Sequence, residues 1–221
     1  PNKQDNILTS EFFHQVIMPV HIPSNEGYFK ESFEILKLSL ESLMKTSHNK
    51  TFITVVANDC INEIEKYLLN LYEEEKIQEI IFTNGIGKIN AVLKGLAGQT
   101  SELVTITDSD VLFLNEWQKE TYKVFESFPK CAAVSPTPSS KVLKQYTSNV
   151  IFENFFSNKL KFSEVKNPEA MKKFGLSLGN NNFYNDVHLE KYLTINNGES
   201  SAVVGAGHFV VTYKTNVFKK P

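Results

Sequence analysis

The sequence of 221 residues has neither an excess of positive charge nor a long apolar segment. Its formal net charge of -2 at pH 7 lacks the basic footprint of a nucleic-acid-binding protein, so we expect no nucleic-acid partner. No run approaches the roughly 18 consecutive apolar residues of a membrane helix, and the N-terminus has no apolar signal-peptide core. These absences predict a cytoplasmic protein without a transmembrane segment, and they leave peripheral contact with a membrane open.

Cysteine and histidine are also scarce, with two and five residues. Cys60 and Cys131 lie far apart and match neither a redox nor a zinc spacing, which favours small buried side chains over a disulfide. The histidines are scattered, and no His-x-x-x-His pair occurs. What is present is a composition with 41% hydrophobic and 22% charged residues, which excludes disordered and fibrous classes. The length suits one large domain.

Two hydrophobic periodicities alternate along the first half of the chain. Short apolar or β-branched runs predict buried strands, whereas apolar residues at helical spacing between charges predict amphipathic helices. The predicted strands are 15–20, 51–57, 77–82 and 102–107, and the predicted helices between them are 29–45, 61–75 and 88–96. This order predicts an α/β fold with a mostly parallel central sheet and helices on both faces.

The second half of the chain has a weaker pattern. A helix is predicted over 115–128 and a strand over 131–135. The stretch 139–197 is rich in Asn, Lys and Phe, so we interpret it as an irregular, partly helical insertion that faces the substrate. Two apolar strands are predicted within 202–213, around a pair of glycines that allow close backbone approach.

An acidic triplet, Asp108-Ser109-Asp110, directly follows the predicted strand 102–107. Alternate residues of an extended strand share a side, so both carboxylates are predicted to project together from the strand's end. Paired carboxylates suit Mn²⁺ or Mg²⁺, which takes oxygen ligands and keeps positions for substrate oxygens. Because Asp and Ser also favour turns and helix caps, an ordinary turn is the alternative interpretation.

Each predicted strand of the first half is followed by a polar segment. Ligands of such sheets bind beyond the carboxyl ends of the strands, where these segments meet. They are 21–27, 58–59, 83–87 and 108–110. The sequence therefore predicts one ligand site at a single edge of the sheet.

The order of these motifs resembles that of the GT-A-fold glycosyltransferases, and most closely that of family 2. The similar segments are Pro19-Val20-His21 at the first strand's end, the Leu-x-Ser-Leu pattern of 38–44, 84–91 against Gly-x-x-x-Ala-Arg-Asn, and 107–111 against Asp-x-Asp. Ordered matches over roughly half of the chain are more specific than a single motif.

The resemblance implies a GT-A, Rossmann-like three-layer sandwich. It implies a single domain over 1–221, with a nucleotide-sugar-binding half at 1–114 and an acceptor-side half at 115–221. The acceptor-side half would be incomplete if the sequence is truncated at its C-terminus. The implied activity is metal-dependent transfer of a sugar from a nucleotide-diphosphate sugar, with a UDP-sugar favoured, to a glycan or other hydroxyl acceptor. Inversion at the sugar carbon is expected.

The resemblance also assigns residues. Asp110 is implied as the direct metal ligand, and Asp108 is implied to reach the ribose, a metal-bound water or the ion itself. His208 is a candidate third ligand. Either Asn58 or Asp59 contacts the base or ribose, because the family usually has Asp-Asp-Gly-Ser at this point. The residues implied in nucleotide-sugar binding are Pro19, Val20, His21, Asn58, Asp59, Gly87, Lys88, Asn90, Asp108 and Ser109.

An inverting transfer needs a carboxylate that accepts the proton of the acceptor hydroxyl. The family's Glu-Asp pair after the Gly-rich loop does not occur before Pro221. Three explanations stay open: the base lies beyond Pro221; Asp186, Glu190 or Glu199 serves, with Asp186 preferred; or the protein is a module that binds a nucleotide sugar without transferring it.

Two other enzyme classes fit the motif order less well. A haloacid-dehalogenase-like phosphatase also has Asp-x-Asp after a strand, but on its first strand rather than on the fourth. A sugar-activating nucleotidyltransferase would need a Gly-rich basic loop after the first strand, and 20–27 has none.

Overall fold

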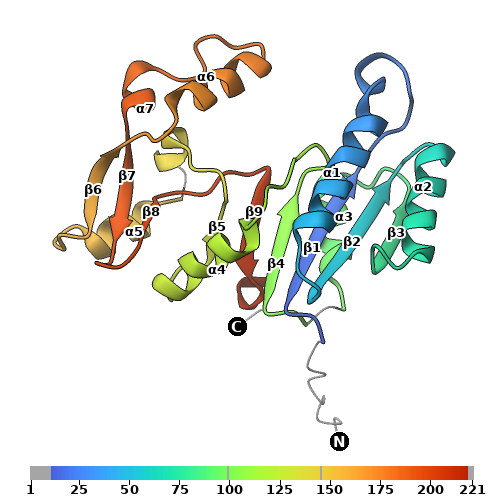
Figure 1. Ribbon diagram of the computed structural model, residues 1–221, viewed down its shortest axis with the longest axis horizontal. Helices are drawn as coiled ribbons and strands as arrows, with labels where there is room; N and C mark the ends of the chain where they lie inside the picture. Colours follow the sequence, from blue (N-terminus) through green and yellow to red (C-terminus); the bar gives the residue numbers. More distant parts are fainter. Residues whose placement is uncertain (1–10, 99, 145, 219–221) are drawn as a thin grey trace, which may run out of the picture. The chain divides into compact units, whose positions relative to one another are not determined.

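The computed structural model describes residues 11–98, 100–144 and 146–218, which form two compact units (Figure 1). The first unit comprises the described residues up to Gln118 together with those from Phe209 onward. The second unit comprises Lys119–His208. The predicted division at 114/115 lies close to the first of these borders, and the assignment of the whole chain to one domain stays a prediction.

The first unit is built on a mostly parallel sheet. Its strands lie in the order β3-β2-β1-β4-β9, in which the first four are parallel and β9 is antiparallel to β4. The strands are β1 (His14–Val20), β2 (Thr51–Asn58), β3 (Glu79–Thr83), β4 (Leu103–Thr107) and β9 (Val210–Lys214). The helical elements are η1 (Gly27–Phe29), α1 (Ser32–Thr46), α2 (Asn62–Glu73), α3 (Lys88–Leu96) and η3 (Thr215–Phe218).

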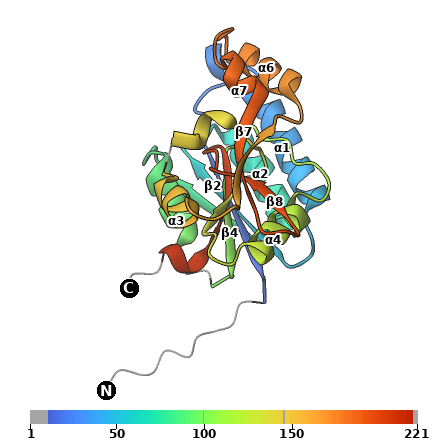
Figure 2. The same ribbon diagram turned by 90° about the vertical axis from the view of Figure 1, so that its left-hand side faces the viewer.

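Helices cover both faces of this sheet. On one face, Val16 and Met18 of β1 belong to a core that includes Leu40 of α1 and Leu68 of α2. On the other face, Ile17 packs in a separate core that includes residues of α3. Figure 2 shows α1 and α2 on the side of the sheet opposite α3. The predicted α/β architecture of three layers with a mostly parallel central sheet is therefore confirmed.

Close packing of α3 against the sheet depends on Gly95. A Cβ atom at this position would lie 2.7 Å from Cγ2 of Ile17. Since real Cβ atoms do not approach other atoms so closely, the glycine allows the helix to lie directly on β1. The start of α3 is thereby held beside the carboxyl ends of the strands.

A buried polar network lies at the N-terminal end of β1. His14 is fully buried, and Nε2 lies 2.6 Å from Oγ1 of Thr105, while Nδ1 lies 3.0 Å from Nε2 of Gln118. The amide nitrogen of Gln118 can only donate, and its amide oxygen accepts from the N–H of His48, so Nδ1 of His14 accepts and Nε2–H donates to Thr105. Burial lowers the pKa of His14 to about 3, with a smaller contribution from His48. The ring is therefore neutral.

We predict that His14 makes the fold sensitive to mild acid. Below pH about 6.5 the unfolded chain takes up a proton on His14 and the folded chain does not, so stability falls with pH. Relative to pH 8, the free energy of unfolding should be about 2 kcal/mol lower at pH 5 from this residue alone. Urea unfolding at pH 8 to 5 measures it. His14→Gln should flatten the dependence, and equal pH slopes in both proteins would contradict the assignment.

The second unit contains a small antiparallel sheet. Its strand order is β6-β7-β8, with bounds β6 (Leu160–Glu164), β7 (Lys191–Asn196) and β8 (Ser201–Val203). The other elements are β5 (Ala133–Val134), η2 (Ser140–Lys144), α5 (Ser148–Asn154), α6 (Pro168–Ser177) and α7 (Asp186–Glu190). The first two residues of α4 (Trp117–Ser127) belong to the first unit and the rest to the second. The prediction of an irregular 139–197 was wrong in part, because β6 and β7 pair within it. β6 is mostly exposed and β7 is only partly buried, so their hydrophobic periodicity is weak.

The two strands predicted within 202–213 exist but do not pair with each other. β8 belongs to the antiparallel sheet of the second unit, whereas β9 joins β4 in the first. Gly205, between them, has a φ of 110°, and a Cβ atom there would lie 2.7 Å from Cγ2 of Val142. This glycine therefore allows close packing against η2.

Among the helices in the described ranges, none has the length and apolar character needed to cross a bilayer. Both cysteines are free thiols of intermediate exposure, so the expectation that they are buried was wrong.

Candidate functional site

A cleft of about 390 Å³ lies at the carboxyl ends of the parallel strands, where the sequence predicts a ligand site. It is lined by the end of β1, the end of β2, the segment leading into α3, and the turn after β4. The lining residues are Pro19, Val20, His21, Asn58, Gly85, Gly87, Lys88, Asp108, Ser109 and Asp110. The strand ends therefore bring together most of the residues that the sequence assigns to nucleotide-sugar binding.

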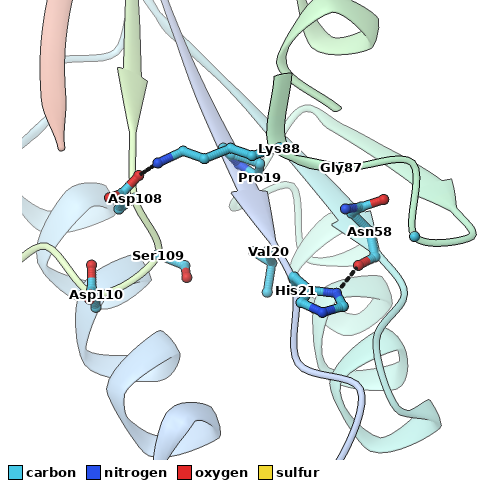
Figure 3. A pocket seen from close by; sticks show the side chains of 10 residues that line it. Pro19, Val20, His21, Asn58, Gly87, Lys88, Asp108, Ser109 and Asp110 are labelled. Carbon is cyan, nitrogen blue, oxygen red and sulfur yellow. Dashed lines mark hydrogen bonds and ion pairs between the residues drawn. The ribbon is translucent and has the colours of Figure 1, made fainter. Parts of the chain in front are cut away.

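The cleft has two chemically different ends. Figure 3 shows Asp108 and Asp110 on one side, and His21 and Asn58 on the other. Lys88 reaches from the start of α3 to Asp108, and its Nζ donates to Oδ1 of that carboxylate. One end of the cleft is therefore ionic. The other end has the polar side chains of His21 and Asn58.

The acidic triplet is a turn rather than an extension of the strand. β4 ends at Thr107, and Ser109 and Asp110 lie in a turn. The prediction that an extended strand aligns both carboxylates was therefore wrong, although both residues line the cleft. Asp110 is exposed, and its carboxylate makes no hydrogen bond or ion pair with the residues that the structure describes. It is available to a ligand.

Backbone and serine contacts hold the triplet in place. The N–H of Asp108 donates to the carbonyl of Phe209 at 2.8 Å, which ties the start of the turn to the segment before β9. Ser39 of α1 donates to the carbonyl of Val111 at 2.8 Å, and Ser42 accepts from the N–H of Phe113 at 2.9 Å. These serines were not predicted as site residues. Their sequence signal is a polar residue on the apolar face of a helix, which needs a partner when buried.

Asn58 positions the loop that leads into α3. Its side chain is buried, and Oδ1 accepts from Oγ1 of Thr83 and from the N–H of Ile86, both at 2.8 Å. Asn90 supports the same loop, because Nδ2 donates to the carbonyl of Ile86 at 2.8 Å. The structure thus places Asn58 at the cleft as a loop anchor, whereas Asn90 does not line the cleft.

Asp59 lies next to the cleft without lining it. Its backbone is in the left-handed region with a φ of 64°, and its N–H donates to the carbonyl of Thr83 at 2.8 Å. The carboxylate lies against Gly85, since a Cβ atom on that glycine would be 3.6 Å from Oδ2 of Asp59. Its implied contact with the base or ribose stays a prediction.

We predict that Asn58→Ala loosens the loop and destabilises the first unit. The change removes the acceptor of two hydrogen bonds and leaves the Ile86 N–H without its partner, which typically costs about 1–3 kcal/mol. Chemical denaturation measures the loss. Asn62→Ala, an exposed change at the start of α2, is the matched control and should stay within about 0.5 kcal/mol of the unchanged protein. Equal losses in both variants would contradict the anchoring role.

The imidazole of His21 lies at the end of the cleft opposite the carboxylates, and its hydrogen bond fixes the position of one ring proton. Nδ1 lies 2.8 Å from the carbonyl oxygen of Asn58, and a carbonyl can only accept. Nδ1 therefore carries the proton, and in the neutral ring Nε2 is an acceptor. Within the described ranges, Nε2 makes no hydrogen bond. The ring packs edge-on against Phe29, with centroids 5.9 Å apart.

The ionic end has the donor set of a hard divalent cation. Asp108 and Asp110 supply carboxylate oxygens, which Mn²⁺ and Mg²⁺ favour, and the open cleft leaves positions for phosphate oxygens. In the part of the chain that the structure describes, no group of three His, Cys, Asp or Glu side chains is arranged to hold a metal. An ion held here would therefore take most of its ligands from the substrate and water.

Two candidate site residues from the sequence analysis belong to the second unit. Asp186 is the exposed first residue of α7, and His208 is exposed just before the border to Phe209. Neither lines the cleft of the first unit. The roles of Asp186 as base and of His208 as metal ligand stay predictions.

Comparison with known proteins identifies relatives of the chain. The profile of the family described as glycosyl transferase family 2 matches residues 16–187. No curated protein matches the sequence.

Several solved structures are similar to the chain. A mannosyltransferase from Pyrobaculum calidifontis in complex with GDP-Man and Mn²⁺ is 20% identical, with a TM-score of 0.48, over 58% of this chain and 36% of that one. Residues 1–349 of S. aureus TarS in complex with UDP-GlcNAc are 18% identical, with a TM-score of 0.46, over 60% and 38%. A 4-diphosphocytidyl-2C-methyl-D-erythritol synthase from Anaerococcus prevotii is 14% identical, with a TM-score of 0.42, over 94% and 72%. The alignments to the first two span less than half of those chains.

Proposed function

The chain belongs to glycosyl transferase family 2, and we propose that it transfers a sugar from a nucleoside-diphosphate sugar to an acceptor hydroxyl, with inversion at the sugar carbon. The first unit has the Rossmann-like α/β sheet of the GT-A fold. One observation carries the proposal: a single cleft at the strand ends has two carboxylates and a lysine at one end and hydrogen-bonding groups at the other. This arrangement matches the diphosphate and the base of a nucleotide sugar.

The ionic end is proposed to bind the diphosphate that leaves with the nucleotide. Asp108 and Asp110 would hold Mn²⁺ or Mg²⁺, which when bound neutralises the charge that develops on the leaving group. Lys88 adds a flexible ammonium group that can donate to phosphate oxygens. Binding of the leaving group at this end orients the sugar carbon for attack from the opposite side.

We predict that Asp110→Asn weakens the metal-dependent part of nucleotide binding. The substitution keeps the size of the side chain and removes the charge of a proposed direct ligand, so Mn²⁺-dependent affinity for UDP should fall at least about tenfold. Isothermal titration calorimetry with and without Mn²⁺ measures it. Glu102→Gln, at the opposite end of β4, is the control and should leave the affinity unchanged. If Asp110→Asn binds as tightly as the unchanged protein, the assignment of the metal site is wrong.

The opposite end is proposed to bind a base that carries a ring N–H group. Nε2 of His21 is an acceptor in the neutral tautomer, which suits the N3–H of uracil. Cytosine has an acceptor at the same ring position, so its lone pair would oppose that of Nε2. Guanine and thymine also carry a ring N–H. UDP-sugars are therefore the favoured donors, with GDP- and TDP-sugars as the next to screen.

We predict that the unchanged protein prefers UDP to CDP by about tenfold, the cost of one mismatched hydrogen bond. His21→Phe should reduce this preference, because it removes the acceptor and keeps an aromatic ring of similar size. Competition binding of UDP and CDP in the presence of Mn²⁺ is the measurement. An undiminished preference in His21→Phe would show that another group selects the base.

The acceptor is proposed to be a glycan or another hydroxyl compound, and Asp186 stays the proposed base among the residues of this sequence. A module that binds nucleotide sugars without transferring them is the second candidate, because no carboxylate besides Asp108 and Asp110 lines the cleft in the described residues. Incubation with UDP-, GDP- and TDP-sugars and Mn²⁺ separates the two. Metal-dependent release of the nucleoside diphosphate supports the transferase, whereas binding without release supports the module.

A further inference from the structure

We propose that Lys88 exchanges its partner, from Asp108 in the free protein to the diphosphate in the complex, and that this exchange couples nucleotide binding to metal binding. The inference rests on the proposed function of the same cleft. In this proposal, only one of the two carboxylates is available to a metal until the nucleotide binds.

In the free protein, Lys88 and Asp108 form an ion pair at the ionic end of the cleft. Nζ of Lys88 donates to Oδ1 of Asp108, and the two side chains are 53% and 29% exposed. The ammonium thus occupies space beside the carboxylate into which a divalent cation would have to bind. Asp110 has no such partner among the residues described. The free protein therefore offers a cation one available carboxylate and one that is already paired.

The Lys88 ammonium group competes with a divalent cation for Asp108. An ammonium group and a divalent cation repel each other, and they compete for the oxygens of Asp108. One free carboxylate binds Mn²⁺ or Mg²⁺ less well than two, because hard cations gain affinity with each charged oxygen ligand. Lys88 is consequently expected to lower the affinity of the free protein for the metal.

A bound diphosphate is expected to draw Lys88 away from Asp108. Lys88 is the first residue of α3 and lines the same cleft as Asp108, so its long flexible side chain can reach a bound diphosphate without backbone movement. A diphosphate carries more negative charge than one carboxylate and attracts the ammonium more strongly. The original pair is exposed and therefore weak, so its loss costs little. Once Lys88 has turned to the phosphate, both carboxylates can ligate the metal.

Coupling of this kind is reciprocal. If UDP raises the affinity for Mn²⁺ by releasing Asp108, Mn²⁺ must raise the affinity for UDP by the same factor. Direct contact between metal and phosphate adds to the coupling but does not involve Lys88. The contribution of Lys88 differs between the two states of the protein. Lys88 weakens metal binding in the free protein and does not weaken it in the UDP complex.

The test measures Mn²⁺ affinity in Lys88→Met, with and without saturating UDP, by electron paramagnetic resonance of free Mn²⁺. In the absence of UDP, the variant should bind Mn²⁺ about two- to fivefold more tightly than the unchanged protein, which is the range expected for loss of a weak exposed ion pair. In the presence of UDP, the two proteins should bind Mn²⁺ equally. The affinity for UDP without metal should fall in the variant.

Two control variants separate pairing from general effects. Lys94→Met removes an exposed lysine from the last turn of the same helix and should change neither Mn²⁺ affinity. Lys88→Arg retains the charge and should keep the weaker metal binding of the free protein. Thermal unfolding by circular dichroism verifies that each variant is folded.

The inference is overturned if Lys88→Met leaves the Mn²⁺ affinity of the free protein unchanged, or if it changes the free and UDP-bound affinities by the same factor. Failure of the proposed function has a different signature: the unchanged protein would bind neither UDP nor another nucleoside diphosphate in the presence of Mn²⁺. The arm without nucleotide still tests the competition between Lys88 and the metal in that case.

Discussion

The first unit depends on the parallel pairing of β1 with a strand on each side. β1 pairs with β2 in a register that places Val20 beside Ala57, and with β4 in a register that places His14 beside Leu103. Since all three strands run in the same direction, their carboxyl ends meet at one edge of the sheet. Cores on both faces hold β1 in this position. The cleft follows from this pairing, because each of its walls begins where a parallel strand ends.

The cleft divides its residues between those that hold its shape and those that face the ligand. Asn58, Ser39 and Ser42 use their side chains within the protein, where they anchor the loop before α3 and the segment after the acidic turn. Buried polar groups of this kind must be paired, and they fix a single arrangement when they are. Asp110 and Nε2 of His21 are left for a ligand. The cleft groups that have no protein partner are therefore held in place by side chains that hydrogen-bond within the protein.

The sequence predicted the first unit well and the second poorly, for a common physical reason. Strands buried on both faces are continuous apolar runs, and the helices between them have apolar stripes, so the period of the pattern identifies each element. α3 was predicted with the bounds that the structure has. β6 is mostly exposed and β7 only partly buried, and their stability depends on antiparallel pairing between residues about thirty positions apart. No local pattern encodes that pairing.

By itself, the sequence determined the alternating order of strands and helices, the position of the acidic triplet after the fourth strand, and the membership of family 2, because each is expressed in local residue types. Only the tertiary structure decided that Asn58 anchors a loop, that Asp108 is paired with Lys88, and that β8 and β9 join different sheets. These contacts join residues distant in the chain. They depend on which strand ends meet in space, and a pattern of neighbouring residues does not specify that.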